Sequence, residues 1–182
     1  MIFTVSQLER IAAWKPADER LACDDPIERH IQPAVSALTS RRWQCHVVDD
    51  GRLSTYYSIA IHPSPKSPPE LLSPPFTPYK GDALLIYLCL KFPVGVIGPT
   101  SIVDEPNFFT ARPLDLNSII TPVKHVSAAV DDVLDVFDES IYRFLNDVEL
   151  SQRLPPHVAP NEYCLCDEPW DRVFHVLFAN TD

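Results

Sequence analysis

The ten residues from Ala83 to Phe92, ALLIYLCLKF, constrain the fold more than any other segment. Apolar side chains occupy both of its alternating faces, which is typical of a strand covered on both sides. Residues 94–97 could form a partner strand after the bend at Pro93. We therefore expect 83–92 to be the central strand of a sheet.

A hairpin is predicted at 42–61, where two alternating segments flank Asp49-Asp50-Gly51. A two-residue loop would place the apolar side chains of one strand opposite the polar side chains of the other, so a three-residue loop is favoured. Gly51 is expected to be left-handed at a bulge. The predicted register pairs Val47 with Leu53, Cys45 with Thr55 and Trp43 with Tyr57.

Two short helices are expected near the N-terminus. Ser6 and Glu9 match a capping box that would start a helix at about 7–14. A second helix is expected to start at Asp25 and to kink or break at Pro33, because proline removes a backbone donor and clashes with the preceding turn.

One long helix is predicted at about 127–150, because apolar residues recur there at spacings of three and four. This stripe consists of Val126, Val130, Val133, Leu134, Phe137, Ile141, Phe144, Leu145 and Val148.

The remaining segments are predicted from proline content and alternation. Seven prolines at 63–78 favour an extended surface connection. Residues 104–122 are expected to be irregular, and 163–166 and 172–178 to be strands. Together these segments predict a single α+β domain with a mostly antiparallel sheet of about five or six strands.

Charge is distributed unevenly along the 182 residues. The net charge of -10 argues against binding the phosphate backbone of nucleic acid. Residues 1–100 hold 10 acidic and 10 basic side chains, whereas 101–182 hold 15 and 5. The negative charge therefore belongs to the C-terminal part, and a basic protein is the expected partner.

The densest acidic cluster lies on the predicted long helix. Like charges four residues apart cost about 0.2–0.5 kcal/mol each, and no lysine or arginine lies within this cluster to offset them. Either this is a solvated face, or it binds a partner. The candidate partner-binding residues are Asp131, Asp132, Asp135, Asp138 and Glu139, with Asp167, Glu168, Trp170 and Asp171 in a later loop.

These features favour an acidic module that neutralises a basic partner, similar in general character to bacterial immunity proteins and other small acidic inhibitors. The alternative is an enzyme or small-ligand domain with a pocket at His46, His175 or Cys45. His175 is also interpretable as a hydrogen-bonded core histidine. No catalytic motif is assembled in the sequence, so an enzyme is the less favoured class.

Neither a metal nor a cofactor is predicted. Cys164 and Cys166 are separated by one residue, and in a strand this spacing fits a tetrahedral zinc ion poorly. The five cysteines are an odd number, which favours free thiols and a cytoplasmic location. No apolar run reaches the roughly 18 residues that a membrane span needs.

Overall fold

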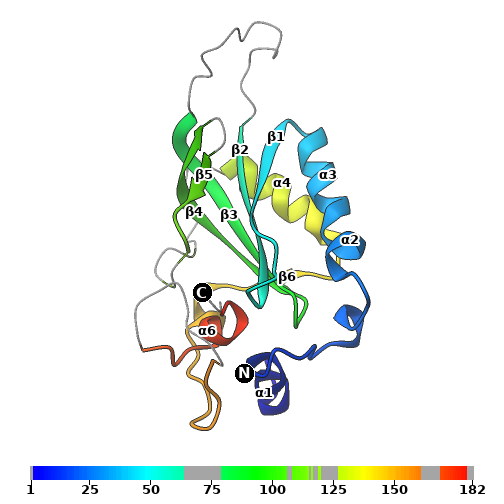
Figure 1. The fold of residues 1–182 in the computed structure, drawn as a ribbon, viewed down its shortest axis with the longest axis vertical. Coiled ribbons are helices and arrows are strands. Elements are labelled where there is room, and N and C mark those ends of the chain that lie inside the picture. The colour runs from blue at the N-terminus through cyan, green and yellow to red at the C-terminus, as the bar shows by residue number, and fades with distance from the viewer. Residues whose placement is uncertain are drawn as a thin grey trace, which may run out of the picture.

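The strand β3 (Tyr79–Cys89) lies at the middle of the sheet, as predicted (Figure 1). The computed structural model describes residues 2–63, 79–105, 108–114, 116, 119, 127–160 and 169–179. The other strands are β1 (Trp43–Asp49), β2 (Tyr56–Pro63), β4 (Val94–Glu105), β5 (Phe108–Ala111) and the short β6 (Arg143–Phe144), which pairs in parallel with β4. The strand order is β1-β2-β3-β4-β5, and every neighbouring pair on this path is antiparallel.

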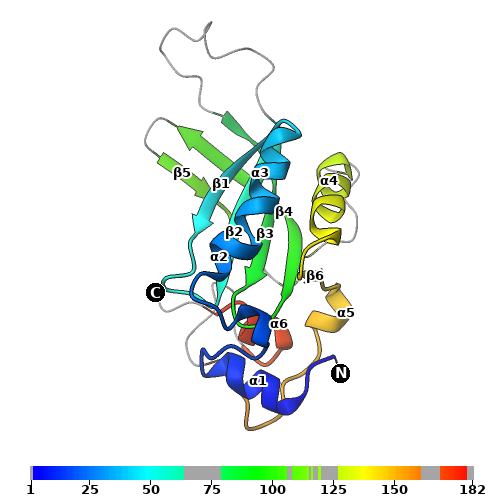
Figure 2. The same ribbon diagram turned by 90° about the vertical axis from the view of Figure 1, so that its right-hand side faces the viewer.

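Helices pack against this sheet, and because the sheet is mostly antiparallel, the α+β class is confirmed (Figure 2). The helices are α1 (Val5–Ala12), the 3-10 helix η1 (Glu19–Leu21), α2 (Pro26–His30), α3 (Gln32–Ser40), α4 (Ser127–Asp138), α5 (Asp147–Leu150) and α6 (Val173–Leu177). The helix α3 contacts α4, whereas α1 contacts α6.

Two apolar cores form because the side chains of β3 alternate between the faces. Leu85, Tyr87 and Cys89 belong to the core with α1 and α6, and we call this side the α6 face. Leu84 and Ile86 belong to the core with α3 and α4, and we call this side the α4 face. The burial of β3 on both sides is therefore confirmed.

The sheet curls until its outer strands meet. The strands β1 and β5 are at opposite ends of the path, yet they contact each other. The rings of His46 on β1 and Phe109 on β5 stack with centroids 4.4 Å apart. The curl therefore brings together residues that the strand order alone would separate.

The strands β1 and β2 pair as a hairpin, but the predicted register is wrong by six residues. Val47 lies opposite Ile59, Cys45 opposite Ile61 and Trp43 opposite Pro63. The connection is longer than three residues because the Asp49 carboxylate accepts hydrogen bonds from the Gly51 amide and the Ser54 hydroxyl. Six is an even number, so the predicted faces are correct for residues within the two strands, where Trp43, Cys45 and Tyr57 pack in one core. Gly51 is left-handed as expected, with φ of 78°, and the register shifts between Val47 and Asp49.

The predicted long helix is wrong after Asp138. The chain turns there, and β6 pairs with Val94 and Gly95 of β4 instead of continuing as helix. A capping box at Asn146 and Glu149 then starts α5. Two members of the predicted stripe are exposed, Leu134 within α4 by 45% and Val148 within α5 by 70%.

The predicted strand at 172–178 is also wrong, because these residues form α6. A short apolar run fits a buried helix as well as a buried strand, so periodicity alone could not separate them. The expected irregular segment 104–122 contains β5. The predicted strand at 163–166 and residues 64–78 of the proline-rich connection lie outside the described residues.

The N-terminal predictions hold with a shift. The helix α1 uses a capping box of Thr4 and Gln7 rather than Ser6 and Glu9. The predicted break near Pro33 is confirmed, since α2 ends at His30 and α3 starts at Gln32. Cys23, Cys45 and Cys89 have free thiols.

Candidate metal site

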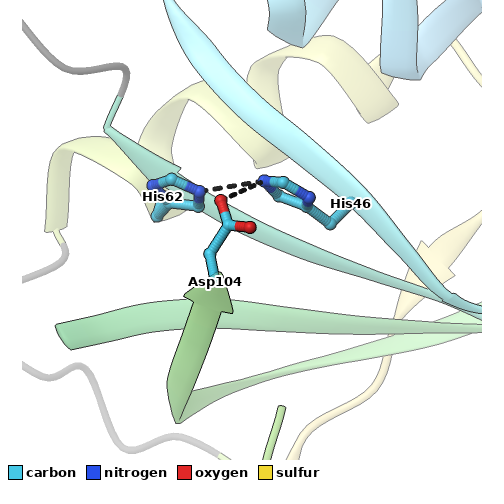
Figure 3. A group of neighbouring side chains, drawn as sticks. All are labelled: His46, His62 and Asp104. Atoms are coloured by element: carbon cyan, nitrogen blue, oxygen red, sulfur yellow. Dashed lines mark hydrogen bonds and ion pairs between the residues drawn. The ribbon is translucent and has the colours of Figure 1, made fainter. Parts of the chain in front are cut away.

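Three side chains from three different strands converge at one point on the α6 face (Figure 3). They are His46 on β1, His62 on β2 and Asp104 on β4. The imidazole nitrogens and the carboxylate are all groups that ligate transition metals.

Strand register and sheet curl explain how the three meet. His46 lies opposite Ala60, so His62 is its diagonal neighbour on the same face of the β1–β2 pair. Asp104 lies two positions after Ile102, a residue of the core on the α6 face, and therefore shares that face. The curl then brings the end of β4 toward β1.

The distances between the ligand atoms suit a single ion. His46 Nε2 lies 3.0 Å from His62 Nε2 and 3.6 Å from Asp104 Oδ2. Two ligand atoms at zinc distances in a tetrahedral arrangement are about 3.3 Å apart. These two distances lie on either side of that value, and all three ligand atoms lie within 4.8 Å of one another, so side-chain adjustments would centre an ion among them.

His62 presents its lone pair to this point. Its Nδ1 is 3.1 Å from the Pro63 carbonyl oxygen, which can only accept a hydrogen bond, so Nδ1 carries the hydrogen. In the neutral ring Nε2 then carries the lone pair, and this atom lies 3.0 Å from His46 Nε2. Burial, followed by the nearby His46, lowers the pKa of His62. The neutral ring required for metal binding is therefore favoured.

His46 is held by rings on two sides. Its ring stacks on His62, with centroids 5.1 Å apart and planes 13° apart, and on Phe109 with planes 6° apart. These contacts fix the plane of the imidazole and keep Nε2 directed at the other two ligands.

The donor set indicates which metals fit. Two imidazole nitrogens and one carboxylate suit zinc and similar first-row transition ions. Calcium prefers six to eight oxygen ligands, and magnesium prefers carboxylates, phosphates and water. A site with two nitrogen donors therefore favours the zinc class.

The acidic cluster on α4 is partly neutralised by Arg41, the residue that follows α3. Arg41 forms ion pairs with Asp132, at 3.0 Å, and with Asp135. The Trp43 indole also donates a hydrogen bond of 2.7 Å to Asp132. The cation missing from the helix sequence is thus supplied from another element, and these two carboxylates help to attach α4 to its neighbours.

The other acidic candidates lie elsewhere. Asp171 forms ion pairs with Arg172 and Arg153. Trp170 is half-buried, and both residues precede α6, which packs on the opposite side of the sheet from α4. Asp167 and Glu168 lie outside the described residues. The described acidic candidates therefore do not form one continuous cluster.

The three predicted pocket residues are not brought together. Cys45 packs on the α4 face, whereas its neighbour His46 points to the α6 face. His175 is buried in α6, where its Nδ1 accepts a hydrogen bond from the Arg172 amide. The interpretation of His175 as a hydrogen-bonded core histidine is confirmed.

Sequence reasoning singled out His46 but missed its two neighbours. The correct β1–β2 register would have placed His62 diagonally beside it. No local signal pointed to Asp104, because its proximity depends on the curl of the whole sheet.

Comparison with known proteins identifies no family for this chain. No family model, no curated protein and no solved structure matches the chain. Within the described residues, no helix is both long and apolar enough to cross a membrane.

Proposed function

We propose that this protein binds one divalent transition-metal ion of the zinc class through His46, His62 and Asp104. The observation that carries the proposal is the convergence of three ligand atoms within 4.8 Å of one another from three strands. Their support by the Pro63 carbonyl and the Phe109 ring matches the outer contacts that orient metal ligands.

Zinc titration of chelator-treated protein tests this proposal. Calorimetry is expected to show one equivalent bound by the wild type. Removing a ligand should cost at least as much as removing an outer contact, so His46→Ala is expected to weaken binding at least about 100-fold. Asp104→Asn is expected to weaken it by about 10- to 100-fold, because the amide retains an oxygen but loses the charge.

A second histidine and carboxylate pair provides the matched control. His157 Nε2 lies 3.3 Å from Glu9 Oε1 on the surface. His157→Ala is expected to leave zinc affinity unchanged, and circular dichroism checks that every variant is folded. Equal zinc binding by wild type and His46→Ala would contradict the proposal.

A second candidate function is binding of a basic protein by α4. Three carboxylates of the cluster, Asp131, Asp138 and Glu139, are exposed and have no ion pair within the described part of the chain. Leu134 is exposed beside them. An apolar side chain among acids is a composition suited to a basic partner, including the immunity-like or inhibitor-like role.

Charge-reversal variants distinguish binding by this α4 surface from non-specific binding that is due to the net negative charge of the whole protein. The triple variant Asp131→Lys, Asp138→Lys and Glu139→Lys is expected to abolish capture of basic proteins from the source organism at moderate salt, because the attraction is electrostatic. A control that reverses the exposed acids Glu19, Asp24 and Glu28 makes the same change in net charge outside α4. Loss of capture in both variants alike would mean that net charge, and not the α4 surface, is responsible.

A further inference from the structure

The site supplies fewer ligands than a zinc ion takes. Among the described residues, three side chains form the group, whereas zinc is almost always four-coordinate. Structural zinc sites are closed and are generally rich in cysteine, whereas sites with three nitrogen or oxygen ligands keep a position for water or substrate. This donor set belongs to the second kind.

Burial indicates on which side that position lies. His62 is only 2% exposed and forms the floor of the site. The side chains of His46 and Asp104 are 27% and 24% exposed. An ion bound by all three would therefore have protein on one side and a route to solvent past the other two ligands.

The net charge of the ion together with its three protein ligands determines which kind of fourth ligand is favoured. A divalent ion with two neutral imidazoles and one carboxylate has a net charge of about +1. Zinc also lowers the pKa of its bound water to about 7 in open sites. A small monoanion, including hydroxide, is therefore favoured over a cation or a dianion.

We propose that the bound ion keeps one position for an exchangeable water, which a small monoanion can replace. This inference rests on the proposed metal binding and adds that the ion is accessible to a ligand from solution. It assigns the site to the ligand-exchanging class of metal centres rather than to the purely structural class.

Cobalt substitution with azide as the probe tests the inference. Cobalt(II) replaces zinc in such sites, and its visible absorption depends on coordination geometry. Addition of azide to the cobalt-loaded protein is expected to shift and intensify the visible bands in a saturable way. Ultrafiltration must show that the cobalt remains bound to the protein throughout the titration.

The possible failures are distinguishable. If one equivalent of cobalt binds but azide leaves the spectrum unchanged, the exchangeable position is refuted while metal binding stands. If the wild type binds no cobalt and no zinc, the proposed function itself is refuted. The His157→Ala protein should respond to azide like the wild type, and a response lost in this variant would place the cobalt at the wrong histidine.

Discussion

Replacing Phe137 by alanine is expected to lower the free energy of unfolding by about 3–5 kcal/mol. The side chain is 1% exposed and contacts the rings of Tyr142 and Phe144 at centroid distances of 6.4 and 5.4 Å. It joins α4 to β6 and to the α4 face of the sheet, so its loss leaves a cavity among three elements. Urea denaturation followed by circular dichroism measures the change.

Leu134 provides the control on the same helix. It belongs to the same apolar stripe in the sequence, but its side chain is 45% exposed. Leu134→Ala is therefore expected to change stability by less than about 1 kcal/mol. Equal losses at the two positions would contradict the observed orientation of α4.

Replacing Thr55 by valine is expected to destabilise the protein by about 2–6 kcal/mol, although the two side chains have nearly the same shape. The Thr55 hydroxyl is fully buried, donates to the Leu177 carbonyl at 2.8 Å and accepts from the Ala179 amide at 2.9 Å. Valine would leave both backbone groups without this partner, at about 1–3 kcal/mol each. Thermal and urea unfolding would both report the loss.

An exposed threonine on a strand supplies the comparison. Thr110 lies on β5 and is exposed. Thr110→Val changes the same atoms with little burial, so an effect within about 0.5 kcal/mol is expected. If Thr55→Val were equally mild, the hydrogen bonds to the C-terminal segment would not be important for stability.

The sequence predicted elements well where a pattern was local. The double apolar alternation of β3 identified the central strand, and the hairpin alternation predicted the correct faces of β1 and β2. The hairpin register failed because the Asp49 side chain stabilises a longer connection. A turn motif alone did not contain that information.

Predictions failed where contacts distant in sequence decide the structure. The apolar stripe of α4 continued past Asp138 in sequence, but pairing of residues 143–144 with β4 overrides helix periodicity. The acidic cluster has no basic residue within its own sequence, but Arg41, which is distant in sequence, forms ion pairs with Asp132 and Asp135. Asp104 joins the two histidines only through the curl of the sheet, which no local pattern encodes.

The attachment of Thr55 to the C-terminal segment also affects how the chain can fold during synthesis. Hydrogen bonds link residues 124 positions apart in the sequence. Phe174 and Leu177 of α6 fill the α6 face beneath β3, so that half of the core is incomplete until they arrive. A nascent chain would therefore expose the apolar face of its central strand until residue 179 has left the ribosome. Long-range closure of this kind slows folding and increases the risk of aggregation.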